Sequence, residues 1–491
     1  MTPALQTCRT TVAWRSADDT RTLAPLTEPA ELPADETFEV VDPATEEPLC
    51  DVADADAAVA SRALDGAVAA EPAWRALPPR ARACILAEAA GALDRDRESL
   101  ARLITLEMGK PIAEARAEVD YAAGYLRWFG ETAVRLHGRF ARAESGDGHV
   151  LTSRQPVGPC LLITPWNFPL AMAARKVAPA LAAGCTAILK PAEEAPVSAV
   201  ALARALAGAG LPAEVLSVLP TSRPAELTQE LLSDTRLRKV SFTGSTAVGR
   251  DLLARSAPGV LRASMELGGN APFVVFSDAD LDAAIEGAMT AKLRNGGEAC
   301  TAANRFLVQR DIAEEFAGRL ARAMGSVRIG PGVDPTATLG PLISAEHRDR
   351  VDSLVADARE RGAKLLCGGR RPDYGGYFYE PTVLWRVPSD AQVMSEEVFG
   401  PVAPIATFED EQDALDQANA TEHGLAAYLY TTDLKRALRV LDRLEVGMIG
   451  LNRGALAAVD APFGGVKASG LGREGGTEGI DEYLETRYLA L

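Results

Sequence analysis

The stretch VGPCLLITPWNFP, residues 157–169, contains an apolar run of strand length that ends at a proline. It is followed by the helix-like AARKVAPALAAG (173–184) and by a second short apolar run in CTAILKPAEEAP (185–196). Strand-like runs that alternate with helical segments of about ten to fifteen residues predict a parallel sheet with helices wound on both faces. Because ligands of such sheets bind beyond the carboxyl ends of the strands, residues that follow these runs are candidates for function.

The alternation extends on both sides of this stretch. Upstream, residues 54–118 have apolar residues at spacings of three and four, which predicts helices packed on the sheet. Downstream it continues through 214–220 and 239–256, and a second alternating series begins at APFVVFSD (271–278). This series has three further strand-like runs, at 305–311, 363–369 and 448–452. At about 100–200 residues per domain, a chain of 491 residues is too long for one core, so we expect two α/β domains.

The segment GIDEYLETRYLAL (479–491) predicts a short helix followed by a strand in which polar and apolar residues alternate. An isolated strand is only marginally stable by itself. We therefore expect it to pair either with the ribbon-like RFARAESGDGHVLTSRQPV (139–157) or with the edge of another subunit.

The composition excludes several classes of protein. A formal net charge of -17 argues against nucleic acid and anionic membranes as partners, and an anionic substrate needs local cations. The seven cysteines include no CxxC pair and no Cys/His cluster at metal-ligand spacing, so we expect free thiols in a reducing compartment and no metal site. The first 25 residues lack an apolar run of signal-peptide length, and charged residues interrupt every long apolar run, which predicts a cytoplasmic protein.

Cys300 differs from the other cysteines in its setting, LRNGGEACTAANR (293–305). Gly296 and Gly297 free the backbone before it. A helix that we expect after it would bring an N-terminus near the sulfur and lower the pKa of the thiol. The alternative is a buried, inert thiol, because free cysteines are commonly small core residues.

Two further segments have features of a dinucleotide site. In SFTGSTAVGR (241–250), free N–H groups near Ser245 suit a pyrophosphate, although a glycine-containing turn without a ligand fits this stretch equally well. In LKPAEEAP (189–196), Glu193 can accept both hydroxyls of a ribose and repel a 2'-phosphate, with Lys190 beside it. A solvated Lys/Glu pair is the alternative there.

Two polar residues after strand-like runs are candidates for catalysis. Asn167 in TPWNFP (164–169) lies between two prolines that fix its backbone, so its amide can donate to an oxyanion; the alternative is a turn in a packed aromatic loop. Glu266 in SMELGGNAP (264–272) is a general base if it faces the thiol across a pocket, and otherwise a structural hydrogen-bonding group.

Seven motifs, taken in order, resemble those of the aldehyde dehydrogenase superfamily over roughly residues 35–491: TPWNFP, LKPAE, SFTGST, MELGGNAP, GGEACTAANR, EEVFGPV and PFGGVKASGLGREGG. Within the superfamily, RNGGEAC, AMAARKVAPALAAGCT, LEVGMIGLN and above all GIDEYLETRY are similar to succinate-semialdehyde dehydrogenases. The resemblance implies a Rossmann-type NAD-binding domain, an α/β catalytic domain and a bridging β-ribbon that joins subunits into homodimers or homotetramers. The implied ranges are 6–133 with 157–268, 269–468, and 138–156 with 480–491.

The resemblance also implies a role for individual residues. Cys300 matches the catalytic nucleophile, Glu266 the general base, Asn167 the oxyanion donor together with the Cys300 backbone N–H, and Lys176 a lysine of the proton relay. The implied cofactor contacts are Thr164, Pro165, Trp166, Lys190, Glu193, Thr243, Gly244, Ser245, Glu397 and Phe399. Glu193 favours NAD over NADP, but NADP stays open because this side chain can swing aside.

The implied reaction is the oxidation of an aldehyde through a thioester on Cys300, which water activated by Glu266 hydrolyses. Arg175 and Arg294 match arginines that clamp the carboxylate of the substrate, for which a planar guanidinium is well suited. Succinic semialdehyde is therefore the expected substrate. Ordinary surface arginines are the alternative at both positions.

The chain departs from the succinate-semialdehyde pattern near the expected substrate. Ala457 and Ala458 stand where that pattern has serines, and alanine cannot donate a side-chain hydrogen bond to a carboxylate. This favours an alternative specificity for ω-amino or broad aliphatic aldehydes. Glu298 replaces a glutamine, and an inward-pointing carboxylate would raise the pKa of the thiol. A catalytically silent, cofactor-binding structural protein is the alternative from a different class.

Overall fold

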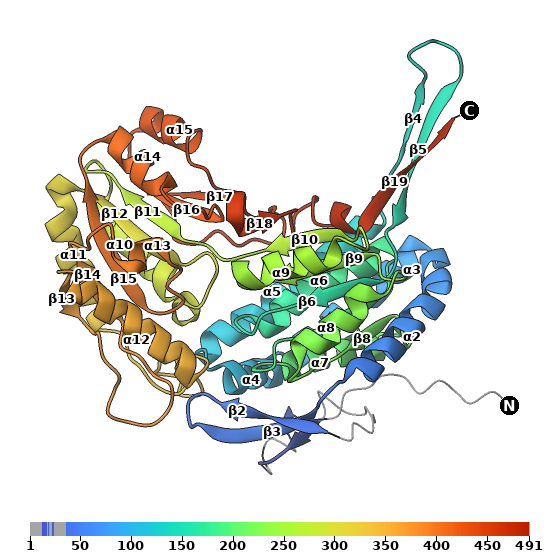
Figure 1. The fold of residues 1–491 in the computed structure, drawn as a ribbon, viewed down its shortest axis with the longest axis horizontal. Helices are drawn as coiled ribbons and strands as arrows, with labels where there is room; N and C mark the ends of the chain where they lie inside the picture. Colours follow the sequence, from blue (N-terminus) through green and yellow to red (C-terminus); the bar gives the residue numbers. More distant parts are fainter. Residues whose placement is uncertain (1–11, 17, 19–21, 24–35, 491) are drawn as a thin grey trace.

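The computed structural model describes residues 12–16, 18, 22–23 and 36–490. Residues 6–11 of the expected cofactor domain and residue 491 of the expected final strand lie outside the described part. The chain forms two lobes, each built on its own sheet, and a three-stranded ribbon projects from one of them (Figure 1). No described helix is long and apolar enough to cross a membrane.

The first sheet has the strand order β18-β10-β9-β6-β7-β8. Its neighbours are parallel, except that β18 runs antiparallel to β10. The strands are β6 (Cys160–Ile163), β7 (Ala187–Lys190), β8 (Leu216–Val218), β9 (Lys239–Thr243), β10 (Arg262–Glu266) and β18 (Gly470–Leu471). The stretch 157–169 thus supplies an inner strand of a parallel sheet, which confirms the prediction.

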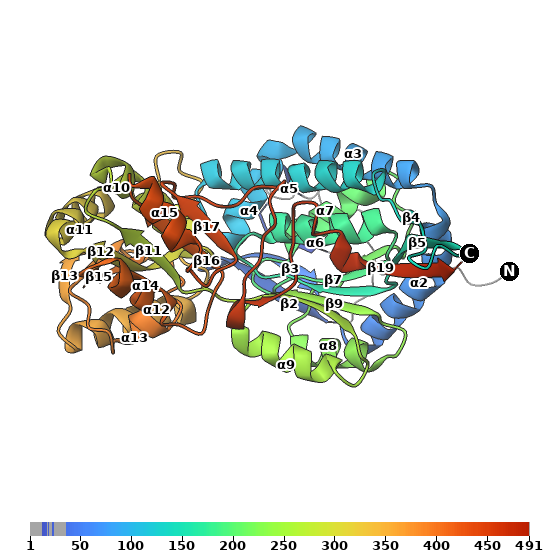
Figure 2. The same cartoon turned by 90° about the horizontal axis from the view of Figure 1, so that it is seen from above.

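Helices cover both faces of this sheet (Figure 2). Cys160 and Leu162 pack into the core shared with α5, α6 and α7, while Leu161 and Ile163 pack into the core shared with α2, α8 and α9. Successive side chains of a strand point to opposite faces, so a strand that is apolar at every position is buried on both. The helices are α2 (Ala57–Ala76), α3 (Pro79–Arg95), α4 (Arg97–Met108), α5 (Ile112–Ala133), α6 (Pro169–Ala183), α7 (Val197–Gly208), α8 (Pro224–Ser233) and α9 (Thr246–Ser256).

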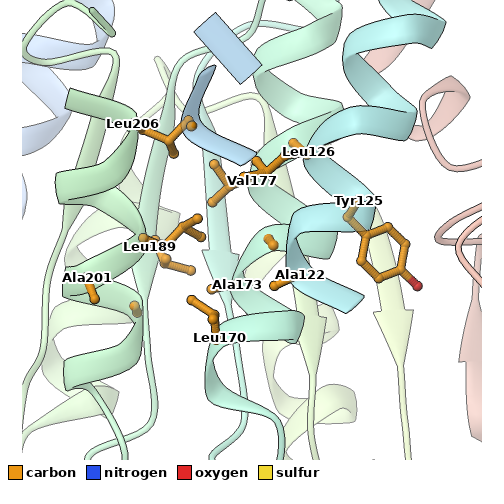
Figure 3. Close-up of a cluster of buried hydrophobic side chains, with 14 of the residues drawn as sticks. Ala122, Tyr125, Leu126, Leu170, Ala173, Val177, Leu189, Ala201 and Leu206 are labelled. Atoms are coloured by element: carbon orange, nitrogen blue, oxygen red, sulfur yellow. The ribbon is translucent and has the colours of Figure 1, made fainter. Parts of the chain in front are cut away.

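Helix α6 lies in the middle of the larger core, and all 15 of its residues are buried. Its many alanines let neighbouring elements approach closely, as the packing of Ala173 and Val177 near Leu126 of α5 shows (Figure 3). Because the helix is packed on every side, its polar residues Arg175 and Lys176 are held in fixed, nearly dry surroundings.

The second sheet has the order β13-β14-β15-β12-β11-β16-β17 and is parallel apart from β13. This confirms the second α/β series. Its strands are β11 (Ala271–Val275), β12 (Ala303–Gln309), β13 (Lys364–Cys367), β14 (Thr382–Trp385), β15 (Val402–Phe408), β16 (Ala426–Tyr430) and β17 (Met448–Leu451). The helices of this lobe are α10 (Leu281–Leu293), α11 (Arg310–Gly325), α12 (Ala345–Glu360), α13 (Gln392–Ser395), α14 (Glu411–Asn419) and α15 (Leu434–Leu441).

The ribbon consists of β4 (Arg139–Arg142), β5 (His149–Pro156) and β19 (Leu484–Ala490). β19 runs antiparallel to β5, from Leu484 opposite Pro156 to Ala490 opposite Val150. Of the two partners expected for the last strand, the ribbon is therefore the one observed within the chain. A three-stranded sheet of β1 (Val12–Trp14), β2 (Thr37–Asp42) and β3 (Glu47–Ala53) was not predicted from the sequence.

Candidate active site

A cavity of about 270 Å³ lies where the chain passes from one lobe to the other, between the end of β10 and the start of β11. Of the sixteen site residues expected from the sequence, twelve line it. They are Pro165, Trp166, Asn167, Arg175, Thr243, Gly244, Ser245, Glu266, Arg294, Cys300, Glu397 and Phe399. The other four, Thr164, Lys176, Lys190 and Glu193, lie outside the cavity wall. The structure thus brings residues from both sheets to one place.

Cys300 is carried by a tight turn that follows α10 and the 3-10 turn Arg294–Gly297. Asn295, Gly296 and Gly297 all have positive φ, and a Cβ on Gly297 would lie 2.2 Å from the Gly400 carbonyl oxygen. The expectation that these glycines shape the loop is therefore confirmed. The expectation of a helix after Cys300 is wrong, because strand β12 follows, and its apolar run 306–308 lies buried in the sheet.

The surroundings of the thiol disfavour its charged form. Burial raises the pKa of Cys300 to about 12, with Arg175 and Arg294 acting in the opposite direction and Glu397 and Glu266 adding to the rise. No helix N-terminus lowers the pKa in the way the sequence suggested. The thiol therefore needs a base nearby to take its proton before it can act as a thiolate nucleophile.

Glu266 ends β10 and is 3% exposed on the cavity wall. Neither of its carboxyl oxygens has a hydrogen-bond partner among the described residues. Burial, reinforced by Glu474, raises the pKa of Glu266 well above its usual value, although Arg175 and Lys176 lower it. A carboxyl group in such surroundings has the basicity that a general base requires.

Glu474 is a site residue that the sequence did not single out. Its carboxylate contacts Arg175 Nε at 2.6 Å and Lys176 Nζ at 2.5 Å, and Lys176 also donates to Ser241 Oγ at 3.0 Å. Glu474 lies in the quoted GREGG segment, but 298 residues separate it from Lys176. The fold therefore brings Glu474, Arg175 and Lys176 together close to Glu266.

Asn167 is held by bonds to its backbone and its side chain. Its carbonyl oxygen accepts from Lys110 Nζ at 2.9 Å and from Asn295 Nδ2 at 3.0 Å. Its own Nδ2 donates to the Glu298 carbonyl oxygen at 2.9 Å, which leaves the second N–H of this amide for another acceptor. Lys110 forms a buried ion pair with Glu118, and neither residue was expected at the site.

Glu298 does not line the cavity. Its Oε1 accepts from the Ile343 backbone N–H at 3.1 Å, and the side chain is 1% exposed. The inward-pointing carboxylate considered from the sequence, which would raise the pKa of the thiol, is therefore not observed.

The opposite end of the cavity has the features expected for a dinucleotide. Ser245 is the N-cap of α9 directly after β9, and Thr243 Oγ1 is buried without a hydrogen-bond partner among the described residues. Glu397 Oε1 accepts from the Gly269 N–H at 3.1 Å. A Cβ on Gly268 would lie 2.5 Å from Glu397 Oε2, so a larger residue there would displace this carboxyl group.

Lys190 and Glu193 lie at the end of β7, where the expected ribose would rest. Lys190 Nζ and Glu193 Oε2 are 3.1 Å apart. The lysine side chain is 6% exposed and the glutamate side chain 42% exposed. This is a half-buried ion pair rather than a fully solvated one.

The two arginines on the cavity wall differ in their surroundings. Arg175 is ion-paired with Glu474, and its guanidinium carbon lies 4.2 Å from the centre of the Phe463 ring. Arg294 lies over the Phe168 ring at 5.1 Å and forms no ion pair with any described carboxylate. Neither is an ordinary surface arginine, because both face the cavity.

The comparisons with known proteins agree with the geometry. A succinate-semialdehyde dehydrogenase of Paenarthrobacter nicotinovorans is 55% identical over 90% of this chain and 98% of its own length. A glutarate-semialdehyde dehydrogenase of Pseudomonas aeruginosa is 47% identical over 93% of this chain and 94% of its own. The crystal structure of succinate-semialdehyde dehydrogenase from Burkholderia pseudomallei superposes with a TM-score of 0.92 at 48% identity, covering 94% of this chain and 95% of that one.

Residues 31–489 match the profile described as the aldehyde dehydrogenase family. The match includes both lobes, the ribbon and the cysteine, glutamate and asparagine that meet at the cavity. A profile match of this length, together with relatives at about half identity, shows that the chain belongs to the aldehyde dehydrogenase family.

Proposed function

We propose that this protein oxidises a short aldehyde bearing a carboxylate at its far end, with succinic semialdehyde as the leading substrate and NAD or NADP as hydride acceptor. The observation that carries the proposal is that one cavity is lined by Cys300, Glu266 and Asn167 and also by two arginines. The names of the relatives, which refer to succinate and glutarate semialdehydes, support the same substrate class.

The cofactor end of the cavity fits a dinucleotide. The unpartnered Thr243 hydroxyl, the start of α9 at Ser245 and the buried Glu397 carboxyl offer polar contacts along one wall. Burial raises the pKa of Glu397 to about 7, so this carboxyl can accept or donate a hydrogen bond to a ribose hydroxyl near neutral pH. Beyond the cavity, Glu193 supports NAD, since a carboxylate repels a 2'-phosphate.

The reaction follows from the placement of the side chains. Glu266 takes the proton of Cys300, and the thiolate adds to the aldehyde carbon. The free N–H of Asn167 and the Cys300 backbone N–H stabilise the alkoxide that forms. A bound dinucleotide supplies the acceptor for the hydride that leaves this carbon, and a thioester remains on Cys300. Glu266 gives up this first proton to solvent and then takes a proton from water, whose oxygen attacks the thioester carbon. The C–S bond breaks, the acid leaves, and Glu266 returns the proton to the Cys300 thiolate.

Arg294 is the better placed of the two arginines to bind the far carboxylate, because among the described residues it forms no ion pair, whereas Arg175 is paired with Glu474. Arg175 shares its charge with Glu474, and its Nη2 has no hydrogen-bond partner among the described residues, so it can add a second contact. Ala457 on the same wall adds room but no donor. The two arginines and Cys300 on one cavity support a substrate that carries a carboxylate at its far end.

The test compares succinic and glutaric semialdehydes with butanal, using NAD and NADP, for the wild type and Arg294→Met. A charge-assisted hydrogen bond contributes about 2 kcal/mol, so Arg294→Met should lower kcat/KM for the charged substrates about 30-fold and leave butanal nearly unchanged. Equal kcat/KM for charged and uncharged aldehydes in the wild type would favour the broad-specificity alternative. Absence of NADH or NADPH production with every aldehyde would favour a catalytically silent protein.

We further propose that the chain forms homodimers or homotetramers through the ribbon, and that the domain ranges expected from the sequence hold. The ribbon exposes Phe140, Tyr488 and Leu489, and large exposed apolar side chains on a projecting element are typical of an interface. The strands β6 to β10 fall within 157–268 and β11 to β17 within 269–468, which supports the division.

A further inference from the structure

Glu298 precedes Cys300 by two residues but does not line the cavity. Its side chain is buried, Oε1 accepts the Ile343 N–H at 3.1 Å, and Oε2 has no hydrogen-bond partner among the described residues. The proposed mechanism gives this carboxyl no role. A buried carboxyl with so few partners is costly to maintain without a compensating contact, so its surroundings call for an explanation.

The nearest ionisable partner of this carboxyl is His347, in the first turn of α12. Its Nε2 lies 3.6 Å from Glu298 Oε1 and 2.5 Å from the Phe399 carbonyl oxygen. Because a carbonyl only accepts, Nε2 carries a proton and donates it to Phe399. The imidazole ring also packs edge-on against the rings of Trp166 and Phe399, which line the cavity.

The backbone of Glu298 faces the catalytic side. Its carbonyl oxygen accepts from Asn167 Nδ2 and from Asn295 Nδ2, both at 2.9 Å. Glu298 therefore contacts the Asn167 amide through its backbone carbonyl group. Its side chain contacts His347, which in turn contacts Phe399 in the cavity wall.

We propose that Glu298 and His347 form a positioning pair. The pair fixes the position of the Cys300 loop and the Asn167 amide relative to Trp166 and Phe399, which line the cofactor end of the cavity. The inference rests on the proposed function, in which Cys300 is the nucleophile and Phe399 contacts the cofactor. The contact between the two side chains, at 3.6 Å, is a polar packing contact rather than a full ion pair, and the hydrogen bonds of the pair go to the Ile343 N–H and the Phe399 carbonyl oxygen. Burial raises the pKa of Glu298 well above its usual value, despite Lys110 nearby, and lowers the pKa of His347, despite Glu346.

The pair makes a specific kinetic prediction. Glu298→Ala removes the acceptor of Ile343 and the contact with His347, so both kcat and the KM of the cofactor should worsen about tenfold or more, since a misplacement of about 1 Å can cost about 100-fold. Glu298→Gln keeps the size and a neutral acceptor and should restore both values to near wild type. Exposed Glu346, next to His347 on α12, gives the matched control, and Glu346→Gln should change neither value.

A double-mutant cycle tests whether the two residues act as a unit. His347→Ala should raise the cofactor KM, and Glu298→Ala with His347→Ala should be little worse than the more impaired single variant. Strictly additive effects, an unchanged Glu298→Ala enzyme, or a Glu298→Gln enzyme as impaired as Glu298→Ala would each overturn the inference. Melting temperatures for every variant separate misfolding from misplacement.

Cys300→Ser distinguishes this inference from the function on which it rests. If Cys300→Ser is inactive and Glu298→Ala is normal, only the positioning pair is wrong. If Cys300→Ser oxidises aldehydes at full rate, the proposed mechanism fails instead.

Discussion

The Cys300 thiol and the Glu266 carboxyl share one dry cavity, and each has a pKa raised by burial. A buried thiol with a pKa of about 12 is almost wholly protonated at neutral pH, so an exposed base in solution would do little for it. A buried carboxylate with a raised pKa is a stronger base than an exposed one. Burial thus makes the Cys300 thiol a weaker acid and the Glu266 carboxylate a stronger base.

Glu266→Gln tests the second use of this base at the residue scale. Without a base to activate water, the thioester should persist on Cys300, and steady-state turnover should fall about 100-fold or more. Because Glu266 also takes the proton of Cys300, rapid mixing should show a slowed burst of reduced cofactor followed by still slower turnover. Mass spectrometry of the quenched protein should find the acyl group on the Cys300 peptide. Full turnover without an acylated peptide would contradict the assignment.

Local sequence was a good guide to single residues where a short motif fixes the backbone. Gly296 and Gly297 before Cys300 have the positive φ that the loop requires. The partners of Arg175 and Asn167 were not predictable in this way, because Glu474 and Lys110 are distant in sequence and no local pattern indicates the contact. The surroundings of the thiol were misjudged because a helix was expected where β12 begins.

At the scale of elements, helices α6 and α7 share an uncommon beginning. Neither has a side-chain cap from its own N-cap residue, Phe168 or Pro196. Buried glutamates from other helices take that place. Glu118 accepts the first N–H groups of α6, and Glu107 of α4 accepts those of Val197 and Ser198 in α7. Capping from a distance ties the helices into one body, and a sequence pattern for local caps cannot reveal it.

The Glu107 contact predicts a pH dependence of stability. Burial raises the pKa of Glu107 from 4.5 to about 7, so the folded protein binds a proton in this range that the unfolded chain releases. The contribution of this proton uptake to the free energy of unfolding is fully present below pH 4.5 and is lost as pH rises through 7. Relative to Glu107→Gln, which cannot titrate, the wild type should lose on the order of 1 kcal/mol between pH 6 and pH 8.

The measurement is the difference in melting temperature between wild type and Glu107→Gln at the two pH values. The melting temperature of the wild type minus that of Glu107→Gln should be larger at pH 6 than at pH 8. A constant difference, or one of opposite trend, would show that the Glu107 carboxyl does not titrate in this range.

At the scale of the whole molecule, the site exists only because two sheets meet. Glu266 ends β10 of the first sheet, and residues 267–270 lead from it to β11 of the second sheet. Cys300 precedes β12, which pairs with β11. The two parallel sheets were predictable because buried strands and helices differ in length and periodicity. The small N-terminal sheet escaped prediction because β2 (TFEVVD) and β3 (EPLCDVA) mix polar and apolar residues, and so lack the continuous apolar run of the buried strands.

The ribbon gives a prediction at this scale. If it joins subunits, Tyr488→Asp, which places a charge on its exposed apolar surface, should lower the molar mass in light scattering toward that of one chain. Tyr374→Asp makes the same change at an exposed tyrosine of the other lobe and should leave the mass unaltered. Equal masses for both variants and the wild type would remove the ribbon from the interface.

Arg294 and Arg175 form a small island of positive charge in a molecule whose net charge is -17. Oxidation of a semialdehyde turns a monoanion into a dianion without moving it. In the proposed reaction, the new carboxylate is left beside Glu266 and Glu397, which line the cavity with Cys300, while the original carboxylate stays bound to the two arginines. Repulsion from the net negative charge of the protein then acts on a dianion instead of a monoanion. The charge that slows binding of the proposed substrate therefore also speeds release of its product.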